Sequence, residues 1–327
     1  MDVRLISPAG VESHDPTDLP ALLARADGLI WVDVPEWDAQ AEQILVDTFG
    51  FHPLAVRDCA NRNQVPKIHR YEDHLFLVLH APQPGAGGHV HYVELDQFIG
   101  DRYLVTVHGP LNPAVDPSAA MVESDVVLNR LMTGKLKPNK GFELSYALLT
   151  ALTGRLRAYT AELTKEVWAL EQRVTGDHLG DPETFLDEMF RARHGLLTVS
   201  TMSALSREVY SRMVTITACG PGSGQSLLLD AVDQFQHLSV MAETQKAYLH
   251  GTIEFYQART NTKMTIAAER LAVIAAVTLP ITALSSVLGM NLIVNSDTHW
   301  ILLAVTLAIM LAMSATLLVW AKRKGWF

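Results

Sequence analysis

Two segments near the C-terminal end of the chain contain only uncharged, mostly apolar residues. Residues 271–288 read LAVIAAVTLPITALSSVL, and residues 300–321 read WILLAVTLAIMLAMSATLLVWA. A helix that crosses a bilayer needs about 20 such residues, and a helix on the surface of a soluble domain keeps a polar face, which neither segment has. The pattern therefore predicts two transmembrane helices, over 271–291 and 300–321, rather than two buried core helices.

The flanks of these segments predict their orientation. The link at 292–299 is so short that the two helices must form an antiparallel hairpin. Positive residues favour cytosolic ends, and Arg270 precedes the first helix while the basic tail 322–327 follows the second. The N-terminal sequence MDVRLISPAG lacks the pattern of a signal peptide. We expect a multi-pass protein of the inner (plasma) membrane, with both termini in the cytosol and the link outside.

The chain before residue 270 has the periodicities of a soluble protein. Apolar or alternating runs predict strands at 3–7, 28–34, 74–80, 90–99 and 103–108, with amphipathic helices at 19–26 and 39–49. Helical spacing predicts further helices at 142–174, at 182–213 with Asp181 as N-cap, and from about 227 to Gly289. We expect an α/β cytosolic domain over 1–140, a cytosolic helical hairpin over 141–225, and a stalk helix over 226–270 that continues into the first transmembrane helix.

Charge and composition exclude several functions. The net charge of -9 lacks the basic footprint of nucleic-acid binding, and it suits either a protein that handles cations or ordinary solubility. Two cysteines, Cys59 and Cys219, are too few for a disulfide framework. The chain has no HExxH motif, nucleophile elbow or phosphate loop. We therefore expect neither an enzyme nor an organic cofactor. His89 and His91 lie on one strand face as a candidate transition-metal pair that lacks a third ligand.

The first predicted span ends in Gly289-Met290-Asn291, directly before the outer link. This tripeptide, placed between two C-terminal spans after a long helix, resembles the CorA family of magnesium channels. Residues 279–282 (LPIT) and the basic, aromatic end 322–327 (KRKGWF) resemble the same family at the same places. The resemblance implies a CorA-like funnel, a homopentamer in the lipid bilayer that passes hydrated Mg²⁺ down the membrane potential.

The resemblance also implies the ion path. Gly289, Met290 and Asn291 would form the selectivity filter, where five neutral Asn291 amides bind the hydration shell of Mg²⁺ without stripping it. Thr282 would supply a second polar ring, and Leu279 an apolar constriction that closes by dewetting. Stepping back along the helix gives the other expected pore-lining residues: Ala275 or its neighbour Ala276, then Ala272, Ala268, Thr265 and Asn261. Leu271 would add another apolar constriction. Each of these could instead face a neighbouring helix.

Closure by intracellular Mg²⁺ at acidic cytosolic sites is a further implication. Asp230 falls near a family sensing position, and Asp233, Glu243 and Glu254 share the stalk; a solvated acidic face is an equal alternative for each. The chain departs from the family at Leu288, where an aromatic residue is usual, and in its link, whose only acid is Asp297. The same fold transporting Zn²⁺, Co²⁺ or Ni²⁺ therefore stays open. An alternative of another class is a membrane-tethered cytosolic signalling or enzyme module.

Overall fold

The computed structural model describes residues 1–327 except 26, 177–180, 218–222, 293–299 and 324–327. Some side chains beside these gaps, including those of Met290 and Asn291, also lie outside the description. The expected outer link, the end of the basic tail and Cys219 therefore lie wholly or mostly outside the described residues. The chain divides into two compact units, Met1–Thr252 and Ile253–Phe327, and each is considered by itself.

The first unit is built on one seven-stranded sheet in the order β2-β1-β3-β7-β6-β5-β4. Strands β3 and β7 pair in parallel, and all other neighbours are antiparallel. All five predicted strands are present, and the hairpin between β6 and β7 is confirmed. The strands are β1 (Asp2–Ser7), β2 (Gly10–His14), β3 (Leu29–Val34), β4 (Lys67–Arg70), β5 (Leu75–Pro84), β6 (Val90–Ile99) and β7 (Tyr103–Val107).

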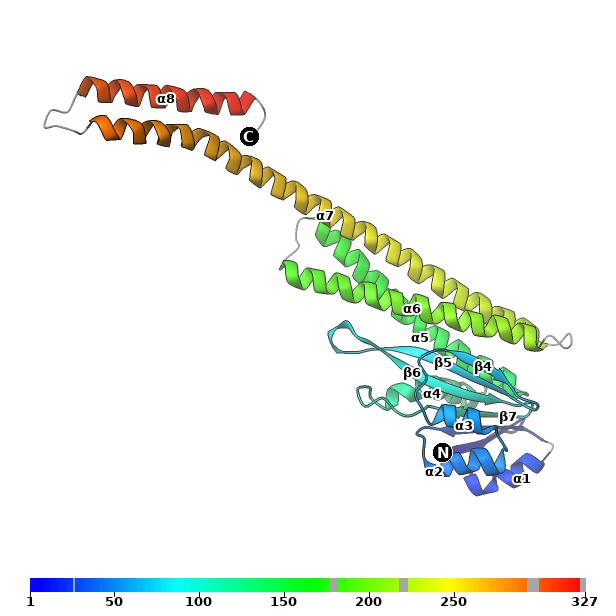
Figure 1. Ribbon diagram of the computed structural model, residues 1–327. Coiled ribbons are helices and arrows are strands. Elements are labelled where there is room, and N and C mark those ends of the chain that lie inside the picture. The colour runs from blue at the N-terminus through cyan, green and yellow to red at the C-terminus, as the bar shows by residue number, and fades with distance from the viewer. Residues whose placement is uncertain (26, 177–180, 218–222, 293–299, 324–327) are drawn as a thin grey trace. The chain divides into compact units, whose positions relative to one another are not determined.

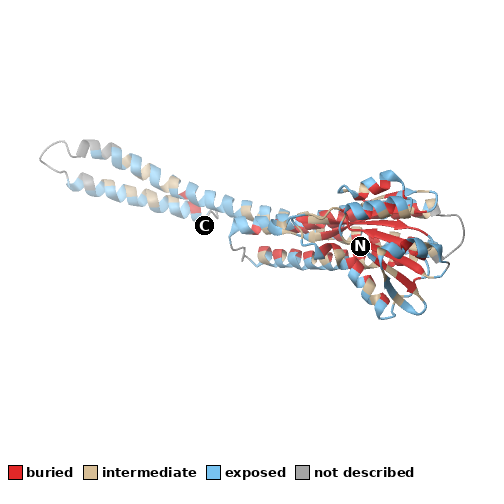
Figure 2. Cartoon of the chain, turned by 90° about the horizontal axis from the view of Figure 1, so that it is seen from below, coloured by how far each residue is buried: buried red, intermediate tan, exposed pale blue. Residues whose placement is uncertain are grey.

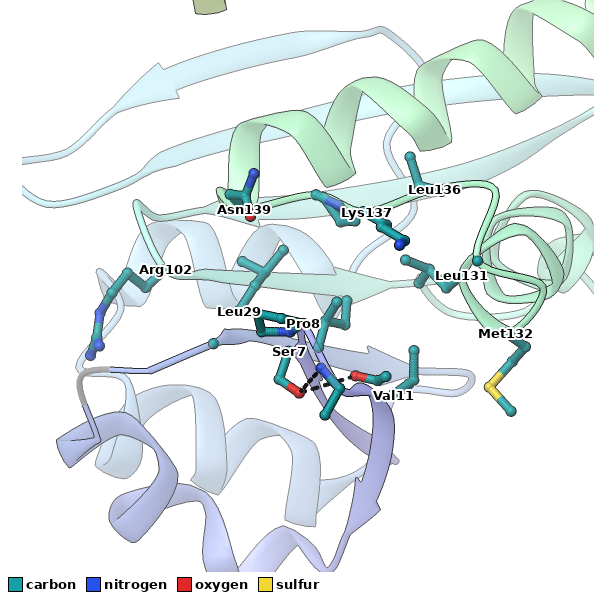
Figure 3. Close-up of a pocket in the computed structure, with 16 residues that line it drawn as sticks. Ser7, Pro8, Val11, Leu29, Arg102, Leu131, Met132, Leu136, Lys137 and Asn139 are labelled. Atoms are coloured by element: carbon teal, nitrogen blue, oxygen red, sulfur yellow. Dashed lines mark hydrogen bonds between the residues drawn. The ribbon is translucent and has the colours of Figure 1, made fainter.

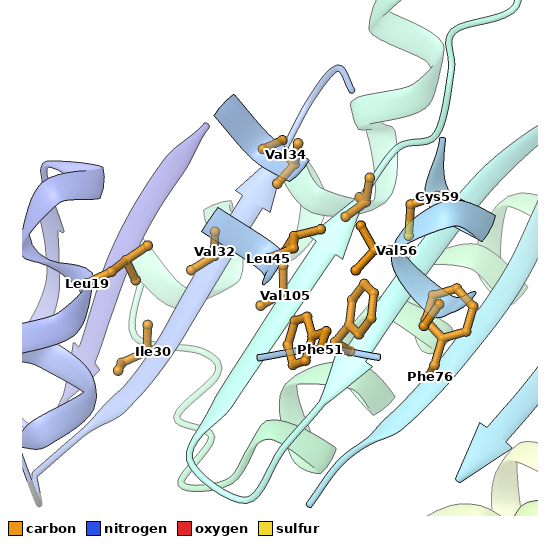
Figure 4. Close-up of a cluster of buried hydrophobic side chains, with 14 of the residues drawn as sticks. Leu19, Ile30, Val32, Val34, Leu45, Phe51, Val56, Cys59, Phe76 and Val105 are labelled. Atoms are coloured by element: carbon orange, nitrogen blue, oxygen red, sulfur yellow. The ribbon is translucent and has the colours of Figure 1, made fainter. Parts of the chain in front are cut away.

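One face of the sheet packs under the short N-terminal helices (Figure 4). These are η1 (Pro16–Asp18), α1 (Leu19–Ala24), α2 (Ala39–Gln43), the π-helical turn η2 (Ile44–Thr48) and α3 (Pro53–Cys59). Leu45 and Phe51 are almost fully buried, and the Phe51 ring stacks on Phe98 of β6 with centroids 4.1 Å apart. Burying such side chains is the main stabilising contribution to the fold.

The other face of the sheet is covered by α4 (Ser118–Met132), α5 (Gly141–Thr175) and α6 (Pro182–Thr217). Helices α5 and α6 form the predicted hairpin (Figure 1). Asp181 is the predicted cap, since its Oδ2 accepts a hydrogen bond of 2.9 Å from the Thr184 main-chain N–H. A short turn, η3 (Ala86–Gly88), joins β5 to β6 and packs against α6.

The last two helices are α7 (Ser223–Leu292) and α8 (Trp300–Arg323). The prediction of one uninterrupted helix from the stalk into the first span is confirmed, because α7 has 70 residues. Its N-terminal part lies beside α5 and α6 in the first unit, and α8 lies antiparallel to its C-terminal part in the second (Figure 1).

The second unit leaves its apolar residues exposed, as the pale helices in Figure 2 show. Two described helices are long and apolar enough to cross a membrane. They are α7, within Gly224–Ser286 at a mean hydropathy of 1.6, and α8, within Ala304–Arg323 at 2.1. Only 6% of either apolar window is buried. That figure argues against two core helices of a soluble protein, whose apolar residues would be covered.

Candidate ion pathway and metal-sensing residues

The predicted pore-lining residues lie along one face of α7. A helix returns to the same face every three to four residues, so Asn261, Thr265, Ala268, Ala272, Ala275 and Leu279 form a stripe. All of these are exposed in the single chain except Ala275, which is half-buried. Leu271 and Leu279 are 67% and 66% exposed. The chain alone therefore leaves this uncharged stripe uncovered.

Pro280 lies inside α7 without ending it. A proline removes its own N–H and leaves the carbonyl four residues earlier, that of Ala276, without a helical donor. The Thr278 hydroxyl donates to the carbonyl of Ile274 at 2.9 Å, and the Thr282 hydroxyl donates to that of Thr278 at 2.8 Å. These two hydroxyls therefore bond to carbonyls other than that of Ala276. They back-bond to their own preceding turns.

The filter tripeptide is the last turn of α7. The helix ends at Leu292, so Gly289, Met290 and Asn291 have helical backbone. A side-chain atom added at Gly289 would have no neighbour within 4 Å. The side chains of Met290 and Asn291 lie outside the description, and the filter assignment stays a prediction.

The predicted sensor acids Asp230 and Glu243 accept hydrogen bonds within the first unit. The Asp230 carboxylate accepts hydrogen bonds from the Tyr146 hydroxyl and, at 2.6 Å, from the Gln234 amide. The Glu243 carboxylate accepts from the Ser200 hydroxyl and, at 2.6 Å, from the Lys246 ammonium. Hydrogen bonds from Lys246 and then Ser200 hold the pKa of Glu243 below its usual range. Hydrogen bonds thus anchor the Asp230 carboxylate to α5 and the Glu243 carboxylate to α6.

Asp233 and Glu254 are exposed on α7. Within the described part of the chain, no three His, Cys, Asp or Glu side chains are grouped so as to hold a metal ion. The partners Tyr146 and Ser200 were not visible in the sequence, whereas Gln234 and Lys246 lie at helical spacing from Asp230 and Glu243.

The structure brings a third imidazole near the predicted histidine pair. The His89 and His91 rings lie 4.7 Å apart between centroids, and His194 of α6 lies 6.3 Å from His89. As they stand, these described side chains are not arranged to hold a metal ion.

A cavity of about 780 Å³ in the first unit lies between the β1–β2 turn and the loop from α4 to α5. Figure 3 shows Lys137 extending from that loop toward Leu131, while Arg102 points away and donates to the Leu23 carbonyl at 3.2 Å. Most of its lining is apolar side chain or backbone, including Leu29 and Pro8. Nothing in this lining places it on an ion path.

An α/β domain that leads through one long helix into two exposed apolar helices defines a two-span membrane protein with a large soluble domain. The model of the family described as CorA-like Mg²⁺ transporter protein matches residues 26–323, and the chain belongs to this family. This confirms the predicted resemblance to the CorA family. It also makes the chain a divalent metal ion transporter of the CorA family, which is a transporter family and not an enzyme family.

Individual relatives agree in length and fold. YfjQ of Bacillus subtilis, an inferred metal ion transporter, is 25% identical over 305 residues, covering 91% of this chain and 89% of its own. The cobalt/magnesium transport protein CorA of Thermotoga maritima is 22% identical over 284 residues, covering 85% and 77%. The complete structure of the CorA magnesium transporter from Methanocaldococcus jannaschii covers 100% of this chain and 99% of its own, at a TM-score of 0.80 and 16% identity. The CorA-like fold is thereby confirmed.

Proposed function

We propose that five copies of this chain form a channel that passes hydrated Mg²⁺ down the membrane potential. The observation that carries the proposal is the stripe of α7 from Asn261 to Thr282, which is uncharged and exposed in one chain. Two spans per chain cannot enclose a pore, so several chains must supply it. Placing α7 at the centre would cover the stripe and line the path with groups that do not bind a bare cation tightly.

Hydroxyl geometry supports a path for a hydrated ion. The Thr282 hydroxyl donates its proton to the carbonyl of Thr278 at 2.8 Å, which leaves its oxygen as an acceptor. Five such oxygens would accept hydrogen bonds from the water shell that Mg²⁺ releases reluctantly. Asn291 amides at the outer mouth would do the same. A divalent ion gains about 4.6 kcal/mol per 100 mV, since each charge gains about 2.3. This driving force needs no nucleotide site.

Gating belongs to the same proposal. Asp230, Asp233, Glu243 and Glu254 lie on the helix that becomes the first span. An ion that bridged these carboxylates to a neighbouring copy would couple intracellular Mg²⁺ to the position of α7 in the membrane. The proposed placement is an inner (plasma) membrane with both termini cytosolic, in line with the basic residues Lys322 and Arg323 that end α8.

A second candidate is the same channel with Co²⁺, Ni²⁺ or Zn²⁺ as its physiological ion. It is favoured by the name of the Thermotoga maritima relative, which lists cobalt before magnesium. Leu288 before the filter, and a link with Asp297 as its only acid, are the sequence features that distinguish this chain from the usual family pattern. A weaker outer field would change which cation is captured.

The test is ion flux into proteoliposomes that hold the purified chain, with each ion supplied separately under an inside-negative potential. We expect saturable Mg²⁺ entry that stops when internal Mg²⁺ rises. Asn291→Ala should lower the initial rate at least tenfold, and Asn129→Ala, an exposed amide on α4, should not change it. Entry of Co²⁺ or Zn²⁺ without Mg²⁺ would establish the second candidate, and equal rates for both variants would refute the filter.

A further inference from the structure

Two acidic side chains are buried next to each other on the sheet of the first unit. Glu94 and Asp96 are two residues apart on β6, so they point to the same face, toward α3. Asp96 is 0% exposed and Glu94 is 7% exposed. Cys59, at the end of α3 and also 0% exposed, lies beside Asp96 (Figure 4 shows Cys59 above the sheet). Acidic residues are almost never buried in this way unless a partner compensates them.

The contacts of Asp96 identify that partner. Within the described part of the chain, neither carboxyl oxygen of Asp96 has a conventional hydrogen-bond donor. Its contacts are the Glu94 carboxyl and the Cys59 thiol. An ionised carboxylate accepts hydrogen bonds but cannot donate one, so two carboxyl groups in contact are mutually satisfied only when one of them carries a proton.

The surroundings of Glu94 show which member is the acceptor. Its Oε2 accepts from the main-chain N–H of Asn63 at 2.7 Å, and its Oε1 from the Asn63 side-chain amide at 2.5 Å. These donors stabilise the ionised form of Glu94. The proton therefore belongs on Asp96, whose surroundings offer it no donor from a main-chain N–H or an ammonium group.

Asn63 is the point where this pair contacts the loop between α3 and β4, residues 60–66. Its side-chain oxygen accepts from the Lys67 ammonium at 2.5 Å, and its carbonyl is 2.8 Å from Nε2 of His80. Lys67 also forms an ion pair of 2.7 Å with Asp58 of α3. The Glu94 carboxylate thus holds both the main chain and the side chain of Asn63, the residue that links this loop to the sheet.

We propose that Glu94 and Asp96 form a single-proton site that fastens the 60–66 loop to the sheet, so that the soluble unit responds to pH. With one proton, Glu94 is an undisturbed acceptor for Asn63. When that proton leaves, two negative charges face each other on a buried surface and repel. The strain is relieved by moving Glu94 away from Asp96, which breaks its bonds to Asn63 and releases the loop. This pH response is independent of the proposed ion path.

The direction of titration agrees with this arrangement. Burial raises the pKa of Asp96 well above its usual range, and the charge of Glu94 raises it further. Burial also raises the pKa of Glu94, although its bonds to Asn63 oppose the shift. Because the folded chain holds this proton more tightly than the unfolded chain does, protonation contributes to the free energy of unfolding. That contribution is present in full below the ordinary carboxyl pKa of about 4. That contribution is lost as the pH rises through the raised value, because the unfolded chain then binds fewer protons than the folded one.

The neighbouring charged groups come from every element around the pair. The Lys67 ammonium of β4 lowers the pKa of both carboxyl groups and so favours their deprotonation, but it is already paired with Asp58. His80 of β5 lies opposite Glu94 in the strand register, and burial lowers its pKa so that it stays neutral. Burial, with Asp96 nearby, also raises the pKa of the Cys59 thiol well above its usual value. Arg62 of the loop and His108, which follows β7, line the same small cavity as Glu94. None of these supplies Asp96 with an ammonium partner of its own.

The first experiment detects the proton directly in the purified full chain. We expect the infrared carbonyl band of a protonated carboxyl group at neutral pH, lost on titration to alkaline pH and absent from Asp96→Asn. The control Asp47→Asn changes an exposed carboxylate on η2 and should keep the band. A neutral-pH spectrum without any difference between the native chain and Asp96→Asn would overturn the proposal.

The second experiment measures the loop. We expect amide hydrogen exchange of peptides covering residues 60–66, corrected for the intrinsic pH effect, to accelerate severalfold as the proton leaves. In Asp96→Asn this pH dependence should disappear. If that variant does not fold, Glu94→Gln serves instead, because a neutral partner also removes the repulsion on titration. Exchange with the same pH dependence in the native chain and in the variant would refute the proposal that the Glu94–Asp96 pair holds the 60–66 loop. Neither readout requires ion flux, so failure here leaves the proposed transport function untouched.

Discussion

The two units of this chain use apolar residues in opposite ways. In the first unit, side chains such as Trp31, Phe76 and Phe98 are 0% exposed, because the sheet and helices of the same chain cover them. In the second unit, Leu279, Ile301 and Leu311 are 66%, 83% and 74% exposed. Among its described residues, only Val273 and Ala321 are buried hydrophobics. The first unit therefore buries these apolar side chains with its own residues, whereas those of the second unit can be covered only by lipid or by other protein chains.

The two units also differ in how their polar side chains find hydrogen-bond partners. The first unit buries charged and polar side chains in pairs, including Asp33 with His108 at 2.9 Å and Glu123 with Arg155 at 3.2 Å. In the second unit, the hydroxyls of Thr278 and Thr282 donate to carbonyls in the preceding turn of their own helix. A helix that satisfies its own backbone is what a lipid environment requires. The contrast indicates that one chain encodes a complete soluble fold but only one part of a membrane assembly.

The largest expected effect breaks the core of the first unit. Phe98→Ala removes a ring that stacks on Phe51 and lies 4.8 Å from Phe76 between centroids. We expect a loss of about 3–5 kcal/mol in the free energy of unfolding, because the cavity cannot collapse fully. The measurement is urea unfolding followed by hydrogen exchange of peptides from β3.

Leu279→Ala is the matched change in the second unit, since that side chain is 66% exposed. It should leave unfolding of the first unit unchanged within about 0.5 kcal/mol. A similar loss for both variants would mean that the units unfold together, and the comparison drawn above would fail.

A smaller effect tests the buried charges. Arg155 donates to Glu123, which is 3% exposed at its side chain, and to Gln83 at 2.6 Å. Arg155→Met should cost about 3 kcal/mol, because it leaves a buried carboxylate without its partner. Adding Glu123→Gln should recover most of that loss. The exposed pair Lys165–Glu162 is the control, and Lys165→Met should cost less than about 1 kcal/mol. Failure of the double variant to recover stability would show that packing, not charge, sets the cost.

The elements that could be predicted from the sequence are those whose own pattern is strong. Helices α5, α6 and α7 carry apolar residues at helical spacing over many turns, and strands β5, β6 and β7 are continuous apolar or alternating runs. The predictions missed β2 and β4, because edge strands bury few residues and so lack alternation. Helix α4 was missed because it buries small and polar residues, such as Ala119, Glu123 and Ser124, in place of an apolar stripe.

The candidate site residues also fall into those that local sequence spacing reveals and those that depend on distant contacts. Helical spacing identified the uncharged face of α7, since that is a property of the segment itself. The contacts that join the predicted sensors to α5 and α6 come from far along the chain: Tyr146 is 84 residues from Asp230, and Ser200 is 43 residues from Glu243. Contacts between residues so far apart in the chain cannot be predicted from local sequence spacing. The buried pair Glu94 and Asp96 was missed for the same reason, because alternating acids on a strand normally indicate an exposed face.

The smallest expected effect lies next to the boundary between the units. Gly251 is inside α7, and a side-chain atom added there would have no neighbour within 4 Å in the single chain. Gly251→Ala should therefore stabilise the helix by about 0.5–1 kcal/mol, because alanine loses less backbone entropy than glycine on folding. Gly195→Ala in α6 is the opposite case, since the added atom would lie 2.7 Å from Leu163 Cδ2 and 2.8 Å from the Tyr159 hydroxyl. Hydrogen exchange of peptides around each site measures both changes. If Gly251→Ala destabilised the assembled protein, another copy must approach α7 at this residue, and the region that depends on outside partners would begin inside the first unit.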